Sequence, residues 1–98
     1  MNITIHSIHF DADTKLESFI ESKITKLSQF YDSIIGAEIF LRLEKAQNSE
    51  NKITEIKVEI PGNDLFAKKQ SSSFEAATDA AIEALRRQIT KHKEKQRG

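Results

Sequence analysis

Residues 37–60, AEIFLRLEKAQNSENKITEIKVEI, decide the fold. From Ala37, and again from Thr54, every second side chain is apolar or small, a period of two that predicts two strands, each with one buried face. The buried faces carry Ala37, Ile39, Leu41 and Leu43 in the first strand and Thr54, Ile56, Val58 and Ile60 in the second. The polar connector Ala46–Lys52 between them predicts a hairpin.

Before this hairpin, the sequence predicts one strand and one helix. Asn2–Ile8 alternates like a half-buried strand, and apolar residues then recur at helical intervals over Thr14–Tyr31. Asp13 or Thr14 can cap this helix, and Thr14 with Glu17 has the spacing of a capping box. Because a helix separates the first strand from the next, we expect the two strands to pair in parallel through a right-handed crossover.

After the hairpin, the sequence predicts a turn, a strand and a long helix. Pro61–Asn63 is typical of a turn, and Leu65 with Ala67 indicates a short fourth strand with Lys68 and Lys69 near its end. Ser72 and Ser73 are candidate caps for the final helix. The predicted buried stripe of this helix is Phe74, Thr78, Ala81, Ile82, Leu85, Ile89 and His92.

The expected fold class is therefore α+β with the order βαβββα. Its four-stranded mixed sheet would carry both helices on one face. A chain of 98 residues, 38% of them hydrophobic and 31% charged, fits one folded domain over residues 1–98. The lack of cysteine excludes disulfides and thiol chemistry. No export signal or apolar run of membrane-spanning length is evident, so we expect a cytoplasmic protein with no membrane partner.

The charge of the chain is balanced overall but unevenly distributed. Fifteen basic residues match fifteen acidic ones, yet residues 1–70 carry nine basic and eleven acidic side chains. The stretch from Arg86 to Arg97 holds six basic residues and only Glu94 as an acid. The positive charge is concentrated at the end of the predicted last helix.

This basic tail lies on both flanks of the predicted buried stripe. Arg87, Lys91 and Lys95 recur every four residues on one flank, and Arg86, Lys93 and Arg97 occupy the other. One interpretation is that the cations offset the helix dipole and favour solubility. The other is phosphate binding, and since the tail has no aromatic residue, structured RNA is a better ligand than unstacked single strands.

Other polar residues carry weaker signals. Lys23 and Lys26 could extend the basic surface from the first helix, although either can equally be an ordinary solvated lysine. His6, His9 and Asp11 resemble metal ligands on paper, but His6 and His9 have opposite parity in a strand and would point to opposite faces. We expect no metal, no cofactor and no small-molecule substrate. The sequence also lacks the spacing of catalytic motifs, so we expect no enzyme.

Three segments resemble the family of ribosome hibernation promoting factors and ribosome-associated inhibitors (protein Y). They are Glu21–Asp32 (ESKITKLSQFYD), Glu83–Lys95 (EALRRQITKHKEK) and Leu41–Lys45 (LRLEK). The resemblance covers nearly the whole chain. This chain departs from the family pattern at the start of the last helix, where Ser73, Phe74 and Glu75 stand in place of the family's usual Asp followed closely by Tyr.

The resemblance implies a fold similar to double-stranded RNA-binding domains and a non-enzymatic function in stress or stationary phase. Such proteins bind 16S-type rRNA of the small ribosomal subunit near the decoding centre and block the mRNA and tRNA sites. The chain resembles the short form of the family, some members of which pair ribosomes with the help of a small partner protein while others inactivate single ribosomes. The absence of an extended tail favours the first outcome.

Nine residues are the predicted RNA contacts. The resemblance matches Lys23 and Lys26 to the family's first-helix lysines, and Arg42 to a position that is often basic. The full set is Lys23, Lys26, Arg42, Arg86, Arg87, Lys91, His92, Lys93 and Lys95. The alternatives are a generic double-stranded RNA-binding module and a small interaction domain whose basic helix serves only solubility.

Overall fold

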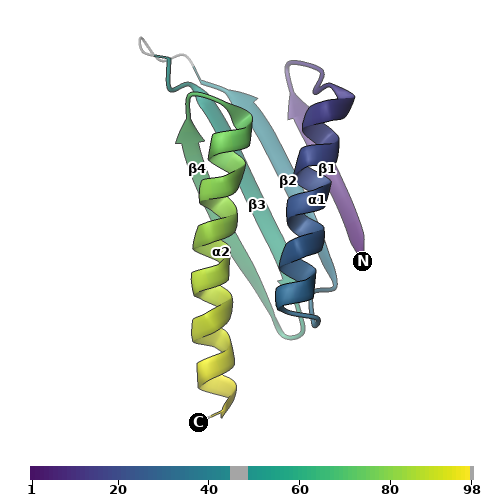
Figure 1. The fold of residues 1–98 in the computed structure, drawn as a ribbon, viewed down its shortest axis with the longest axis vertical. Helices are drawn as coiled ribbons and strands as arrows, with labels where there is room; N and C mark the ends of the chain where they lie inside the picture. Colours follow the sequence, from purple (N-terminus) through teal and green to yellow (C-terminus); the bar gives the residue numbers. More distant parts are fainter. Residues whose placement is uncertain (45–48, 98) are drawn as a thin grey trace.

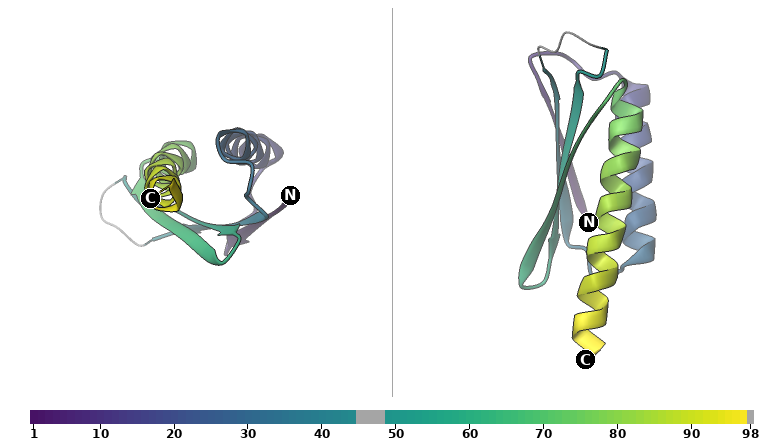
Figure 2. Two further views of the ribbon diagram at one scale, coloured as in Figure 1. Left: turned by 90° about the horizontal axis from the view of Figure 1, so that it is seen from below. Right: turned by 90° about the vertical axis from the view of Figure 1, so that its left-hand side faces the viewer.

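The computed structural model describes residues 1–44 and 49–97, and it shows one four-stranded sheet with two helices on the same face (Figures 1 and 2). The elements are β1 (Asn2–Ile8), α1 (Thr14–Phe30), β2 (Gly36–Leu43), β3 (Lys52–Ile60), β4 (Asn63–Ser71) and α2 (Phe74–Arg97). Their order confirms the predicted βαβββα fold. The strands lie in the order β1-β2-β3-β4, with β1 parallel to β2 and the other neighbours antiparallel.

The ends of α1 refine two predictions. Asp13 is the N-cap, and its carboxylate accepts a 2.8 Å hydrogen bond from the Leu16 backbone N–H, while Thr14 is already the first helical residue. The helix ends at Phe30, one residue earlier than predicted, because Tyr31 adopts an extended backbone. The Tyr31 N–H still bonds to the Leu27 carbonyl at 3.0 Å and closes the last turn.

The fourth strand is longer than predicted. Gly62 has a φ of +78°, a conformation that glycine adopts without strain, so two residues complete the turn and Asn63 already pairs with Ile60. The pairing then continues to the far end of β3, where Ser71 lies opposite Lys52. Lys52, predicted as connector, is thus the first residue of β3. The predicted connector residues 46–48, and Lys45 of the LRLEK segment, lie outside the described residues.

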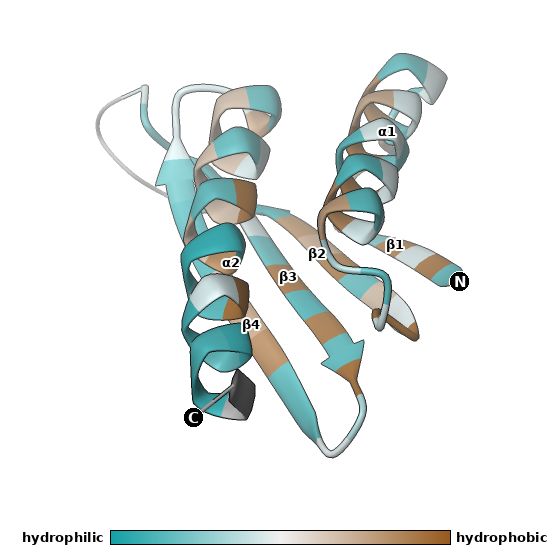
Figure 3. Cartoon of the chain, turned by 60° about the horizontal axis from the view of Figure 1, so that its bottom comes forward, coloured by the Kyte–Doolittle hydropathy of each residue, from teal (hydrophilic) through white to brown (hydrophobic). Residues whose placement is uncertain are grey.

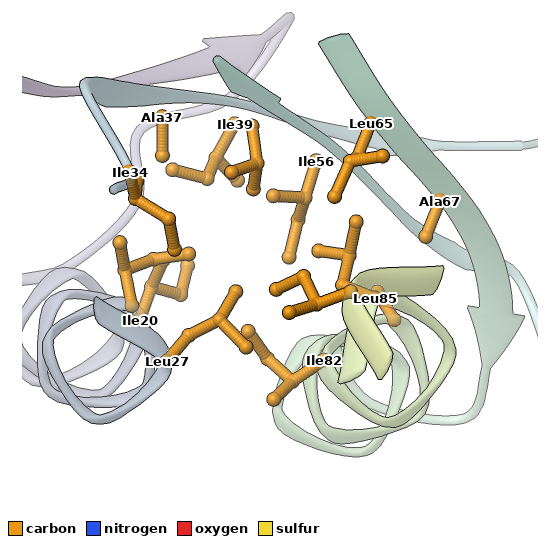
Figure 4. Close-up of a cluster of buried hydrophobic side chains, with 14 of the residues drawn as sticks. Ile20, Leu27, Ile34, Ala37, Ile39, Ile56, Leu65, Ala67, Ile82 and Leu85 are labelled. Carbon is orange, nitrogen blue, oxygen red and sulfur yellow. The ribbon is translucent and has the colours of Figure 1, made fainter. Parts of the chain in front are cut away.

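The core lies between the inner face of the sheet and the two helices (Figure 4). Ile20 and Leu27 of α1 meet Ile39 and Ile56 of the sheet, and Leu85 of α2 closes the layer; all five side chains have no exposed surface. The predicted stripe of α2 is buried from Thr78 to Ile89, while Phe74 and His92 at its two ends are only partly buried. The Thr78 hydroxyl lies 3.4 Å from that of Thr54. The more hydrophobic residues of α2 face the sheet while its outer side is hydrophilic (Figure 3).

Helix α2 begins at a serine cap and continues beyond the sheet. The Ser73 hydroxyl accepts a 3.0 Å hydrogen bond from the Ala76 N–H, which selects Ser73 of the two predicted caps. At its other end, α2 extends past the β3–β4 turn (Figures 1 and 2). The basic tail therefore projects from the body of the molecule.

Candidate nucleic-acid interface

Helices α1 and α2 run in the same direction, so their C-terminal ends lie at the same end of the molecule (Figure 1). The C-terminus of a helix carries partial negative charge and unpaired carbonyls. The last turn of α1 contains no basic residue of its own. Lys93 of α2 supplies one, since its ammonium group donates a 3.0 Å hydrogen bond to the carbonyl of Phe30. This contact supports dipole complementation as one role of the basic tail.

Most other cations of the tail are free of such contacts. Arg87, Lys91 and Lys95 are exposed, and no ion pair joins them to another residue within the described ranges. The first half of α2 carries acids, with Glu75 in its first turn and Asp79 beyond it. The helix is thus acidic near its start and basic near its end, which concentrates positive charge on the projecting part.

A hollow between α1 and α2 brings together cations from both helices. It has a volume of about 270 Å³ and is lined by Lys23, Lys26, Asp79, Ile82, Glu83 and Arg86. The Lys23 ammonium lies 3.0 Å from a carboxylate oxygen of Asp79, a half-exposed pair. Lys26 forms no ion pair in the described part of the chain. The prediction that Lys23 and Lys26 extend the basic surface of α2 agrees with this arrangement.

A second hollow lies on the other flank of α2, against the start of β4. It has a volume of about 230 Å³ and is lined by Asn63, Leu65, Gln88, Lys91, His92 and Lys95. The Gln88 amide donates a 2.8 Å hydrogen bond to the Phe66 carbonyl and ties α2 to the edge strand. Cations therefore border hollows on both sides of α2. We call Lys23, Lys26, Arg86, Arg87, Lys91, Lys93 and Lys95 the basic surface.

An aromatic side chain that sequence reasoning missed lies beside the basic surface. Phe30, the last residue of α1, is 38% exposed and lies beside two cations of α2. The Arg86 guanidinium carbon is 5.4 Å from its ring centre, and the Lys93 nitrogen is 4.5 Å from it. The sequence of the basic tail contains no aromatic residue, but the fold places Phe30 of α1 beside it. No linear signal connects residues more than fifty positions apart.

His92 packs against Tyr31, the residue that follows α1. Its ring is edge-on to Tyr31, with 6.2 Å between ring centres, and its Nε2 atom is buried without a hydrogen-bond partner in the described part of the chain. The predicted position on the apolar stripe is thus confirmed. Its predicted RNA contact stays a prediction, for which only its half-exposed edge at the second hollow is available.

Arg42 lies apart from the basic surface. It is on the sheet face opposite the helices, where it forms an ion pair with Glu55. On the same open face, His6 stacks on Phe40 and its Nε2 lies 2.9 Å from a Glu38 carboxylate oxygen. This hydrogen bond from His6, with a smaller contribution from Lys57, holds the pKa of Glu38 below its ordinary value of 4.5.

The remaining sequence candidates lead to no site. Over residues 1–44 and 49–97, no three His, Asp or Glu side chains are close enough together to hold a metal ion. His6 is engaged with Glu38, while His9 is exposed beyond the end of β1 with a φ of 65°. None of the helices in these ranges combines the length and apolar character needed to cross a membrane.

Comparison with solved structures confirms the fold. A ribosomal subunit interface protein from Coxiella burnetii superposes with a TM-score of 0.83 at 24% identity, covering 95% of this chain and 98% of that one. The N-terminal domain of Thermus thermophilus Protein Y gives a TM-score of 0.80 at 22% identity, covering 94% and 99%. At these identities the likeness concerns the fold alone.

Comparison of sequences identifies the family. Residues 3–97 match the family described as Sigma 54 modulation protein / S30EA ribosomal protein. A ribosome hibernation promoting factor of Klebsiella oxytoca is 33% identical over 95 residues, which cover 97% of this chain and 94% of that protein. One of Escherichia coli K12 is 28% identical over 95 residues, covering 97% and 96%. These matches confirm the predicted resemblance and, with it, a non-enzymatic family. The chain belongs to the S30EA ribosomal protein family and is a homologue of the ribosome hibernation promoting factors.

Proposed function

We propose that this chain is a hibernation factor that binds the small ribosomal subunit near the decoding centre and contacts 16S-type rRNA through the basic surface. Occupying this position blocks the mRNA and tRNA sites and stops translation in stress or stationary phase. The family supports the proposal, since relatives of this chain are named ribosome hibernation promoting factor.

The observation that carries the proposal is the convergence of cations from two helices at one end of the molecule. Lys26 of α1 shares a hollow with Arg86 of α2, and the exposed Lys91 and Lys95 border a second hollow on the far side of α2. Lysine and arginine heads neutralise phosphates without reading bases. A projecting helix with cations on both flanks suits a folded RNA recognised by its shape and backbone.

The first experiment is sedimentation of the chain with purified small subunits, with and without a large excess of duplex RNA. We expect co-sedimentation that duplex RNA does not compete away. Binding to duplex RNA as tight as binding to the subunit would instead support a generic double-stranded RNA-binding module. Binding to neither would leave solubility as the role of the basic tail. The sedimentation of whole ribosomes with the chain, alone and with a cell extract, shows whether ribosomes are paired or held single.

A charge-reversal variant tests the surface itself. Changing Arg87, Lys91 and Lys95 to Glu alters only exposed side chains without ion pairs in the described ranges, so we expect loss of subunit binding with little change in thermal unfolding. Reversal of Lys15 and Lys68, exposed in the first turn of α1 and on the open sheet face, is the control for charge reversal away from the basic surface. The first turn of α1 lies at the opposite end of the molecule (Figure 1). Retained binding by the triple variant would show that the contact surface lies elsewhere.

A further inference from the structure

Phe30 is a partly exposed aromatic residue that lies beside two cations. It ends α1 with 38% of its surface exposed and lies outside the buried core. Its neighbours on the exposed side are the cations Arg86 and Lys93, at 5.4 Å and 4.5 Å from the ring centre. Both distances are within the range of a cation–π contact.

The two cations reach the same ring because of their spacing on α2. Arg86 and Lys93 are seven residues apart, so they lie on the same side of the helix, about two turns or roughly 10 Å apart along its axis. Phe30 lies between these two turns. Lys93 is held further by its hydrogen bond to the Phe30 carbonyl and by the Tyr31 ring, 5.5 Å from its nitrogen.

Such contacts matter because free lysine and arginine side chains sample many rotamers. Fixing them on RNA reduces this freedom and weakens binding, unless the free protein already holds them in place. Of the basic surface, Arg86 and Lys93 lie against Phe30, and Lys23 lies over Phe19 and pairs with Asp79. Arg87, Lys91 and Lys95 have no ion-pair or ring contact in the described ranges. The ring thus distinguishes two cations from their neighbours.

We propose that Phe30 is a positioning residue of the basic surface, whose ring and carbonyl hold Arg86 and Lys93 ready for RNA phosphates beside the hollow between α1 and α2. This inference rests on the proposed ribosomal function and deepens it. The contacts favour positioning over direct stacking of an RNA base on Phe30, because two cations already lie against the ring.

The test begins with the free protein, so that it does not depend on ribosome binding. Nuclear magnetic resonance should show the Lys93 side-chain methylene protons shifted upfield by the Phe30 and Tyr31 rings. In Phe30→Leu most of this shift should disappear, while Phe30→Tyr should retain it. Unshifted Lys93 signals in the wild-type protein would overturn the inference, whatever the ribosome experiments show.

Binding to small subunits is measured next. Phe30→Leu should weaken binding roughly threefold to tenfold, about the worth of one or two exposed cation–π contacts, with an unchanged salt slope because no charge is lost. Phe30→Tyr should bind like the wild-type protein. Phe66→Leu is the matched control, since Phe66 is 50% exposed on the open sheet face and should leave binding unchanged. Equal binding by Phe30→Leu and the wild-type protein would overturn the inference.

A double-mutant cycle separates positioning from base stacking. If Phe30 acts through its cations, Phe30→Leu should cost less than about twofold in a chain that already carries Arg86→Met and Lys93→Met. A loss as large as in the wild-type background would overturn positioning and indicate direct contact with a base. Failure of the wild-type protein to bind subunits would refute the proposed function instead, and the shifts in the free protein would still test whether Phe30 holds Lys93.

Discussion

The salt dependence of subunit binding follows from the ion pairs of the basic surface. Lys23 is paired with Asp79, whereas the other six cations form no ion pair in the described ranges. Those six are Lys26, Arg86, Arg87, Lys91, Lys93 and Lys95. If each neutralises one phosphate, log K should fall against log salt with a slope of about −5. Affinity should then drop roughly a thousandfold between about 50 and 200 mM monovalent salt.

Neutral substitutions identify the residues that cause this salt dependence. Changing Arg87, Lys91 and Lys95 to Gln should reduce the slope by about three units, since each lost contact removes roughly 0.9. The control changes Lys15 and Lys68 to Gln, two exposed residues in the first turn of α1 and on the open sheet face, and should leave the slope unchanged. The assay is subunit co-sedimentation across a series of potassium concentrations at fixed magnesium. A wild-type slope shallower than about −2, or an unchanged slope in the triple variant, would refute the electrostatic account.

Three further variants probe the site and the fold. Asp79→Asn should raise subunit affinity roughly twofold to fivefold at low salt, because it frees Lys23, whose ammonium lies 3.0 Å from the Asp79 carboxylate. Unchanged affinity in a binding titration would show that Lys23 does not face RNA. Leu85→Ala should lower the free energy of unfolding by about 3 kcal/mol in urea titrations, since the side chain is fully buried, and a loss under about 1 kcal/mol would argue against that burial. Glu38→Gln should weaken the acid sensitivity of thermal unfolding. Because folding lowers the pKa of Glu38, its stabilisation is fully present above its ordinary pKa of 4.5 and is lost as pH falls through the lower folded-state value. An equal fall of melting temperature with pH in the wild-type protein and the variant would contradict this role of Glu38.

The sequence alone was sufficient for the order of elements and for most of the core. One residue of the predicted buried face of β2 was wrong, because Leu43 at the end of the strand is 51% exposed. Strict alternation in β2 and β3, and helical recurrence in α1 and α2, select the buried faces because burial of apolar surface dominates folding. The length of β4 was underestimated because its second half has no such hydrophobic pattern. Beyond Ala67 its residues are polar, and only their pairing with β3 up to Ser71 keeps them extended. A strand held by its neighbour's hydrogen bonds leaves little trace in its own hydrophobic pattern.

Arg42 illustrates how two kinds of sequence inference diverge. Its parity in β2 already placed it opposite Ile39 and Leu41, away from the face that the helices cover. The family resemblance nevertheless placed it among the RNA contacts. In the structure it pairs with Glu55 on the open face, so it shares no surface with the cations of α2. A contact from Arg42 would need RNA on both sides of the sheet.

The sequence by itself determined that six positive charges gather at the end of α2, because charge and helical spacing are properties of the chain. Only the tertiary structure decided what surrounds them. The parallel course of α1 and α2 directs both helices toward the same end of the molecule, and it sets Lys93 on the carbonyl of Phe30 and Phe30 between Lys93 and Arg86. These contacts join residues more than fifty positions apart, so they depend on how the helices pack on the sheet and not on any local pattern.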